Sequence, residues 1–425
     1  MTSRPSLASL PQELLDLIVD LLSDSRQALA CLRLASRLFY GRSRLHIYRS
    51  LTITTPRRSF AAFVEDLAGT HGDIRPHVQH LTLSRYGTRD GEDGKPPEPV
   101  TAGLVKALLE LLPHLRRLTF SFVTLAPEPD RALWERPLPH FELAALSFLQ
   151  VETAQLWGCE AYLEILSLFH AIDTLTSTDR FAWPWPAPGE LDPELLPAPC
   201  FPRALAVRHL HMGDVRASHW LALLSHTRTL AAGAPALAAL DVALVPHAAR
   251  APSAEASAAL GTAGAHLASL RVRLWPDFHA AHAPYAHAAQ LPAVGRWCPR
   301  LATFAVRVPL WCSLRYILGV VECVATLLFG LPPTVRTFAL ELDLEGHPWP
   351  VVERARECMP RYLWEMLKFA IEGAGVTRVD LVWLHLRLAA GEDVRLRQEL
   401  SETDTMILAG LESHLYTVQS TFEAY

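Results

Sequence analysis

Histidine and cysteine are the residues in this sequence whose side chains are best suited to chemistry. The stretch HAAHAPYAH contains His279, His282 and His287, and Cys298 follows it. Imidazole and thiolate groups are ligands for transition metals, so these residues would bind such an ion if the fold brought them together. Their spacing matches no zinc-binding pattern, and the segment is rich in alanine. We therefore interpret them as solvent-exposed histidines and expect no metal site and no cofactor.

Sequence motifs of common enzymes are absent from the chain. It contains no GxGxxG, no GxxxxGK[ST], no HExxH and no GxSxG. We therefore predict no catalytic residue and no enzymatic activity. A hydrolase or transferase on an α/β fold stays open as an alternative, because a single sequence does not reveal residues that meet only in space.

Two further histidines indicate binding rather than catalysis. His209 and His211 flank Leu210 in the segment VRHLHM. In a strand, alternate side chains point to opposite faces, so both histidines are expected on the face opposite Leu210. They are candidates for target binding, although a plain solvated face would show the same pattern.

A proline-rich segment from Asp179 to Pro202 carries three large aromatic residues, Trp183, Trp185 and Phe201. Long loops with aromatic residues are frequent recognition elements, so these three are also candidates for target binding. The alternative is that they only fill a gap along the side of the domain.

The bulk composition restricts the class of protein. The chain has 425 residues, of which 50% are hydrophobic, and its net charge is -5, which gives no basic surface for nucleic acid. Its seven cysteines form no CxxC pair, and this favours reduced thiols inside a cell. No secretory signal or membrane span is evident. We expect a cytoplasmic or nuclear protein that binds neither nucleic acid nor membranes.

The N-terminal residues predict three short helices. In SLPQELLDLIVDLL, Pro11 suits the first position of a helix, and leucines then recur at three- and four-residue steps. The segments QALACLRLASRLFY and SRLHIYRSLTI continue the pattern as a second helix and a third element. So small a unit cannot bury all its leucines by itself, so another surface must cover some of them.

The order of these residues resembles the F-box, in the form common in fungal proteins. The resemblance rests on the Leu-Pro-x-Glu-Leu opening, on Ser36-Arg37 with Phe39, and on the closing YRSLTI, and covers about residues 7–53. It implies docking on the small Skp-type adaptor subunit of cullin-RING ubiquitin ligases. The residues that would make this contact are Leu10, Pro11, Leu14, Leu15 and Ile18, with Leu32 in the second helix.

The rest of the chain contains a repeated pattern of apolar residues. Ten segments of the form hydrophobic-x-x-hydrophobic-x-hydrophobic, with one degenerate copy, start at intervals of 28 to 41 residues between Val78 and Val376. Most are separated by stretches with helical spacing, such as Thr101–Leu115 and Pro360–Gly375. A short strand followed by a helix in every repeat would build a parallel sheet with a continuous core.

This pattern resembles the strand segment of leucine-rich repeats and implies an irregular solenoid. Regular repeats have Asn or Cys three residues beyond the last leucine, whereas this chain has residues such as Val123 and Val151 there. An ordinary α/β domain of βαβ units is the alternative. Our predicted fold class is α/β, with an F-box-like trihelical unit (1–55), a connecting helix or linker (56–75), a leucine-rich-repeat-like solenoid (76–391) and a capping helix or tail (392–425).

Together, these patterns predict a substrate-recognition adaptor of an SCF-type ubiquitin ligase. The first helices would dock on the Skp-type adaptor, and the repeats would bind a target protein whose identity the sequence does not give. The alternative is a ligase-independent binding scaffold in which the first helices cap the repeats.

Overall fold

The computed structural model describes residues 10–55, 58–85, 98–130, 141–153, 159–177, 205–212, 237–244, 264–274, 294–309, 314–343, 361–384, 411 and 417–422. The chain forms two compact units, Met1–Leu205 (unit 1) and Ala206–Tyr425 (unit 2). Both are α/β, with parallel strands and helices, which confirms the predicted class.

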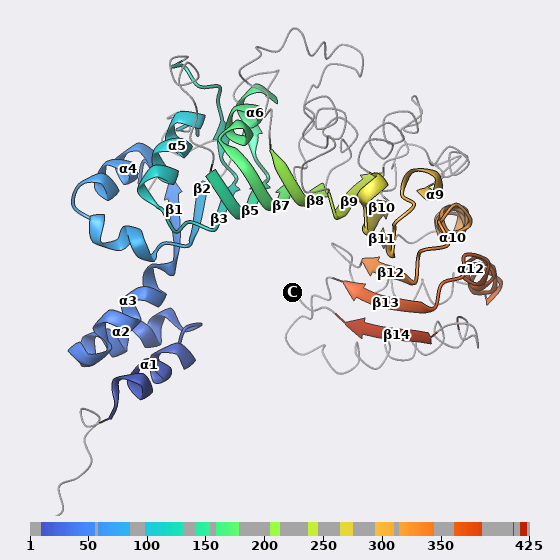
Figure 1. The fold of residues 1–425 in the computed structure, drawn as a ribbon, viewed down its shortest axis with the longest axis horizontal. Coiled ribbons are helices and arrows are strands. Elements are labelled where there is room, and N and C mark those ends of the chain that lie inside the picture. Colours follow the sequence, from blue (N-terminus) through green and yellow to red (C-terminus); the bar gives the residue numbers. More distant parts are fainter. Residues whose placement is uncertain are drawn as a thin grey trace, which may run out of the picture. The chain divides into compact units, whose positions relative to one another are not determined.

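The sheet of unit 1 contains five parallel strands that neighbour one another in chain order. They are β1 (Ser50–Thr55), β2 (His80–Arg85), β3 (Arg117–Ser121), β5 (Phe141–Leu149) and β7 (Phe169–Ser177). Three helices lie on one side of these strands (Figure 1): α4 (Phe60–Ala68), α5 (Ala102–Leu111) and α6 (Cys159–Ser167). We expected the sheet to start after residue 75, but β1 is already part of it, because Ser50 to Thr55 pair with β2.

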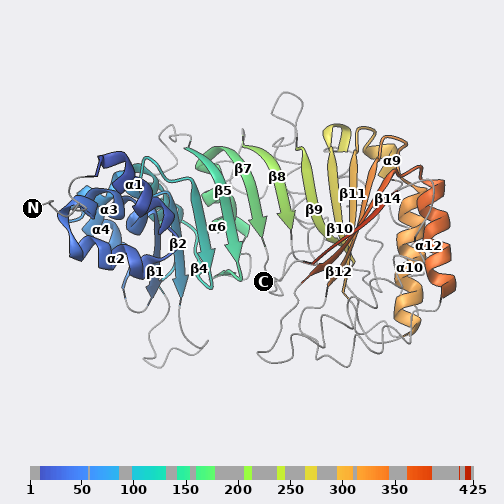
Figure 2. The ribbon, with the colours of Figure 1, turned by 90° about the horizontal axis from the view of Figure 1, so that it is seen from below.

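The sheet of unit 2 contains seven described strands, also parallel and in chain order. They are β8 (Ala206–Met212), β9 (Ala239–Leu244), β10 (Ser269–Leu274), β11 (Thr303–Pro309), β12 (Thr337–Asp343), β13 (Arg378–Leu384) and β14 (Thr417–Phe422). The helices α9 (Val294–Trp297), α10 (Leu314–Phe329) and α12 (Arg361–Gly373) lie along one side of strands β10 to β14 (Figure 2). We expected a helix or a tail near the C-terminus, whereas Thr417 to Phe422 continue the sheet beside β13.

All ten repeated segments supply a strand, and their apolar positions form the core. The fourth residue of every copy is buried: Leu81, Leu118, Leu146, Leu175, Leu210, Leu240, Leu270, Phe304, Phe338 and Val379. Strand alternation places these side chains on one face of their sheet. In unit 1, Phe120 and Phe148 stack with ring centroids 5.1 Å apart, and Phe148 also contacts Tyr162 at 4.5 Å.

In the turns after β3 and β5, Val123 and Val151 occupy the positions where regular leucine-rich repeats have asparagine or cysteine. Phe122 and Gln150 directly follow these strands with positive φ angles of 57° and 52°. This left-handed conformation interrupts the alternation of the strand, and the next residues, Val123 and Val151, are 1% and 0% exposed. The amide of Phe122 donates to the carbonyl of Leu149 at 3.0 Å, which satisfies one backbone group of the turn.

Glutamates cap two helices of unit 1, α4 and α5, from the segment of the chain that follows each helix. The Glu98 carboxylate accepts bonds from the Ser59 hydroxyl and from the amides of Phe60 and Ala61, at 2.8 to 3.0 Å, at the start of α4. Glu128 accepts the amide of Gly103 in α5 at 2.5 Å. A Cβ at Gly103 would lie 2.5 Å from that carboxylate oxygen, so any other residue there would displace the end of the Glu128 side chain from the amide.

Candidate protein-docking surfaces

Three helices precede the sheet of unit 1 and lie together at its β1 end (Figure 1): α1 (Gln12–Leu21), α2 (Arg26–Ala35) and α3 (Tyr40–Arg49). Pro11 caps α1 rather than occupying its first position, and its carbonyl accepts the amides of Leu14 and Leu15. The Ser25 hydroxyl accepts the amide of Ala28 and so caps α2. These caps fix where the helices start.

The helices share a small core. Leu15, Val19, Leu29 and Phe39 are buried, and Leu10, Leu22, Leu32 and Ile47 pack against them half-buried. Leu15 is 2% exposed, so its side chain holds α1 in place and is not available for direct contact with a partner. Of the expected contact residues, Pro11 and Leu14 are exposed and Ile18 is half-buried.

A row of exposed leucines lies along α1. Leu14, Leu17 and Leu21 are 46%, 54% and 77% exposed, and their spacing of three and four residues places them on one side of the helix. We call these three residues the leucine rim. Seven of the ten large exposed hydrophobic side chains in the described residues lie between Leu14 and Leu45, which marks this region as a contact surface.

Sequence reasoning identified Leu14 but missed Leu17 and Leu21 as surface residues. The signal was present, because Leu14, Leu17 and Leu21 are spaced i, i+3, i+7, whereas Leu15, Val19 and Leu22 are spaced i, i+4, i+7 on another side of the helix. When a helix has two apolar sets, one packs into the core of its own domain and the other is available for contact with another surface. Only the structure shows which set is which.

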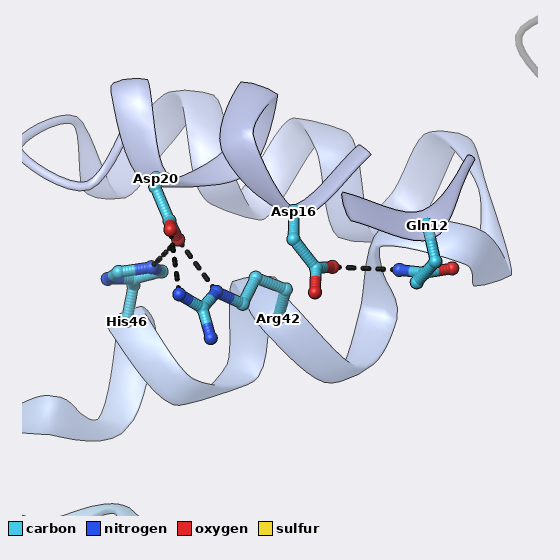
Figure 3. A network of polar contacts seen from close by, with 5 residues as sticks. All are labelled: Gln12, Asp16, Asp20, Arg42 and His46. Carbon is cyan, nitrogen blue, oxygen red and sulfur yellow. Dashed lines mark hydrogen bonds and ion pairs between the residues drawn. The ribbon is translucent and has the colours of Figure 1, made fainter. Parts of the chain in front are cut away.

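A polar network holds α1 against α3 (Figure 3). The Asp20 carboxylate accepts two bonds from Arg42, both 2.7 Å long, and lies 2.7 Å from Nε2 of His46. The hydrogen bonds from Arg42 and then from His46 hold the pKa of Asp20 far below its ordinary value of 3.8. Asp20 therefore stays ionised throughout the neutral range, and this contact fixes the helix that carries the leucine rim.

The candidate target-binding residues of unit 2 lie on β8. His209 and His211 are half-buried and Leu210 is buried, so the two histidines share the sheet face opposite the core, as alternation predicts. We call this side, which is opposite the buried apolar positions, the open face of a sheet. The residues Trp183, Trp185 and Phe201 lie outside the described residues.

The open face of unit 2 carries a line of charges next to His211. Nδ1 of His211 lies 3.6 Å from the Asp241 carboxylate, which lies 3.7 Å from Arg271. Nε of Arg271 also contacts Glu341 at 2.8 Å. Glu341 is 4% exposed, and its burial raises its pKa, while the charge of Arg271 acts in the opposite direction.

A search of the described residues for metal-binding groups finds no cluster of three or more His, Cys, Asp or Glu side chains. His279, His282 and His287 lie outside this part of the chain. Cys298 is buried, and burial raises the pKa of its thiol to about 11, so it is a protonated core residue. Among the described helices, none has the length and apolar character that crossing a membrane requires.

Comparisons with known proteins assign no family to the chain. No protein-family model matches it, and no curated protein matches it either. A functional proposal therefore depends on the sequence patterns and on the surfaces described above.

Proposed function

We propose that this chain is a substrate-recognition adaptor of an SCF-type cullin-RING ubiquitin ligase. In this proposal the N-terminal helices are an F-box-like unit that docks on a Skp-type adaptor subunit. The two sheets with their helices form an irregular leucine-rich-repeat-like solenoid that holds the target protein. The chain supplies proximity, because it brings the target to a separate enzyme at high effective concentration.

The observation that carries the proposal is the leucine rim. Three leucines stand exposed on α1, although the helices beneath them have a buried core of their own. Exposed leucines in a row cost free energy in water, so their presence favours a partner that covers them. An F-box-like unit is expected to present such a surface to its adaptor.

The repeat pattern supports the second half of the proposal. All ten repeated segments form parallel strands in chain order, and several are followed by a helix on the same side. Successive strand–helix repeats of this kind are typical of solenoids, and the open face of such a stack is an extended binding surface.

The alternative function is a ligase-independent scaffold whose first helices cap the repeats. That reading requires the apolar side of α1 to be covered by the chain itself. Leu17 and Leu21 are 54% and 77% exposed, which favours the adaptor reading over the scaffold reading.

Binding of the full-length chain to a purified Skp-type adaptor tests the proposal. Leu14→Ala with Leu17→Ala removes two rim side chains and leaves Leu15 and Val19 in the core. We expect at least about a tenfold loss of affinity, because central apolar side chains dominate such interfaces. The matched control is Phe329→Ala with Phe369→Ala, which removes two exposed apolar side chains from unit 2.

The control is expected to bind like the parent, and circular dichroism shows whether each variant is folded. Absence of binding by the folded parent would refute the adaptor function and leave the scaffold as the better account. Equal loss in the rim variant and in the control would show that the contact is not specific to α1.

A further inference from the structure

Three arginines surround His80 at the edge where strands β1 to β3 begin. Arg117 is aligned with His80 and Ser50 across the open face of unit 1. Arg49 and Arg116 come directly before this row, because Gln79 donates to the carbonyl of Arg49 at 2.9 Å and accepts the amide of Arg116 at 2.7 Å. We call Arg49, Arg116 and Arg117 the arginine edge.

The positive charge of the arginine edge affects the pKa of the neighbouring His80. Burial lowers the pKa of His80 below 6.5, and the charges of Arg117, Arg49 and Arg116 lower it further. All three arginines are exposed. Within the described residues, Arg116 and Arg117 have no carboxylate partner, whereas Arg42 and Arg44 of α3 are paired with Asp20 and Asp73.

A row of hydroxyl groups crosses the same face, two residues further along each strand. Its members are in register on five neighbouring strands: Thr52, Thr82, Thr119, Ser147 and Thr176. None is buried. Since neighbouring strands lie about 4.8 Å apart, the hydroxyls form an evenly spaced line of donors and acceptors perpendicular to the strands. We call this line the hydroxyl row.

The two features together define the ligand chemistry. Guanidinium groups bind carboxylate and phosphoryl oxygens through paired, charge-assisted hydrogen bonds. Where the described part of the chain pairs no carboxylate with the arginine edge, those bonds are open to a ligand. The hydroxyl row can bond to both the N–H and the C=O groups of an extended peptide. An extended chain with acidic side chains satisfies both features.

We infer that the arginine edge and the hydroxyl row form a binding surface for an extended acidic segment of a target protein. This inference rests on the proposed function for its biological role, since it assigns the chemistry of the target. It places target recognition in unit 1, beside the helices that carry the leucine rim. Acidic side chains of the segment contact the arginine edge, and its backbone follows the hydroxyl row.

Fluorescence anisotropy with the full-length chain and short labelled peptides tests the surface. One peptide alternates glutamate and serine, a second has phosphoserine in place of glutamate, and a third has glutamine there. We expect both acidic peptides to bind and the glutamine peptide to bind at least about tenfold more weakly. Comparison of the first two shows whether the anion is a carboxylate or a phosphoryl group.

The variant Arg116→Gln with Arg117→Gln removes two exposed charges from the arginine edge. The affinity of this variant for the acidic peptide is expected to be at least about tenfold lower than that of the parent. Raised salt should lower the affinity of the parent as well. The matched control is Arg300→Gln with Arg336→Gln, which removes two exposed charges from unit 2 and should change affinity by less than about twofold.

Unchanged binding of the acidic peptide to the folded arginine-edge variant would overturn the inference, as would equal binding of the glutamine peptide. Tighter binding of single-stranded RNA than of either peptide would overturn it in favour of a different ligand class. The assay contains no ligase subunit. If the chain binds the peptide but not the Skp-type adaptor, the adaptor function is refuted and the peptide-binding surface is supported.

Discussion

The open faces of the two sheets differ although their cores follow one pattern. In both units the inward positions of the strands are apolar and buried. The open face of unit 1 carries the hydroxyl row and the arginine edge, for which the described residues supply no carboxylate partner and in which Arg49 bonds to the Gln79 side-chain amide. The open face of unit 2 carries carboxylates and arginines that contact one another, with Arg271 between Asp241 and Glu341.

This difference distinguishes charged residues that stabilise a sheet by pairing with one another from charged residues that are available to bind a ligand. The charges at Arg271 and Glu341 satisfy one another, so a ligand at that point must compete with an existing ion pair. At Arg116 and Arg117 no carboxylate of the described residues is paired with the guanidinium groups, so a ligand there has no described ion pair to displace. Residues of the same types therefore stabilise unit 2 and remain available for binding in unit 1.

The largest expected effect concerns the two aromatic cores. Phe148→Ala should lower the free energy of unfolding by about 3 to 5 kcal/mol, because it removes a fully buried ring from unit 1. Phe338→Ala in unit 2 should lower it by about 1 kcal/mol less, since Phe148 has two ring partners and the ring contact described for Phe338 is the one with Phe304. Urea denaturation of both variants measures the difference. A larger loss for Phe338→Ala would contradict it.

The second effect tests whether the ion pair of unit 2 is structural. Arg271→Met removes the cation that contacts the buried Glu341 carboxylate and leaves the charge of Arg307 on the neighbouring strand, so it should destabilise the chain by about 2 to 3 kcal/mol near pH 7.5. The matched control Arg378→Met breaks an exposed pair with Asp380 and should cost less than about 1 kcal/mol.

The pH dependence of Arg271→Met has a definite sign. Burial raises the folded-state pKa of Glu341 above its ordinary value of 4.5, and Arg271 opposes this rise. Without Arg271 the folded pKa rises further, so the penalty grows as the pH increases above 4.5 and is smallest below it, where the carboxyl is protonated in both states. Equal destabilisation at pH 4.5 and pH 7.5 would show that the carboxylate charge is not involved.

The sequence predicted the strands well because their signal is local. The apolar positions of every repeated segment, such as Leu81 or Phe304, are spaced as a half-buried strand requires, and each segment forms one. The ends of the sheets were harder to predict. Tyr48, Leu51 and Ile53 follow the same spacing, but Tyr48 belongs to α3, and Thr417–Phe422 lacks the third apolar position; both segments are strands beside a neighbouring strand that offers them hydrogen bonds.

The candidate sites were only partly predictable for a different reason. The spacing of Leu14, Leu17 and Leu21 is visible in the sequence, but which side of α1 faces the core depends on where Leu29 and Phe39 lie. The arginine edge is invisible in the sequence, because Arg49 and Arg116 are brought to either side of Gln79 only by the register of β1, β2 and β3.

A third effect concerns the carboxylates of unit 1, which bond to backbone rather than to arginine. Glu98→Gln should destabilise the chain by about 1 kcal/mol, because it removes the charge that the amides of Phe60 and Ala61 and the Ser59 hydroxyl stabilise at the start of α4. Thermal unfolding measures the loss. Glu110→Gln, an exposed residue within α5, is the control and should change stability very little.

The smallest effect on stability should come from a substitution in the hydroxyl row, where the open faces of the two units differ. Thr119→Val keeps the shape of a half-buried side chain in β3 and removes its hydroxyl, so the free energy of unfolding should change by no more than about 0.5 kcal/mol. The acidic peptide should lose about two- to tenfold in affinity, because one hydrogen bond is removed from its binding surface.

The control substitution in unit 2 is Thr303→Val, which lies on the open face of β11 and should change neither quantity. Anisotropy and urea denaturation of the two variants measure both effects. Loss of stability without loss of peptide binding in Thr119→Val would mean that the hydroxyl row supports the sheet. Loss of binding without loss of stability would mean that the open face of unit 1 differs from that of unit 2 because it binds a ligand.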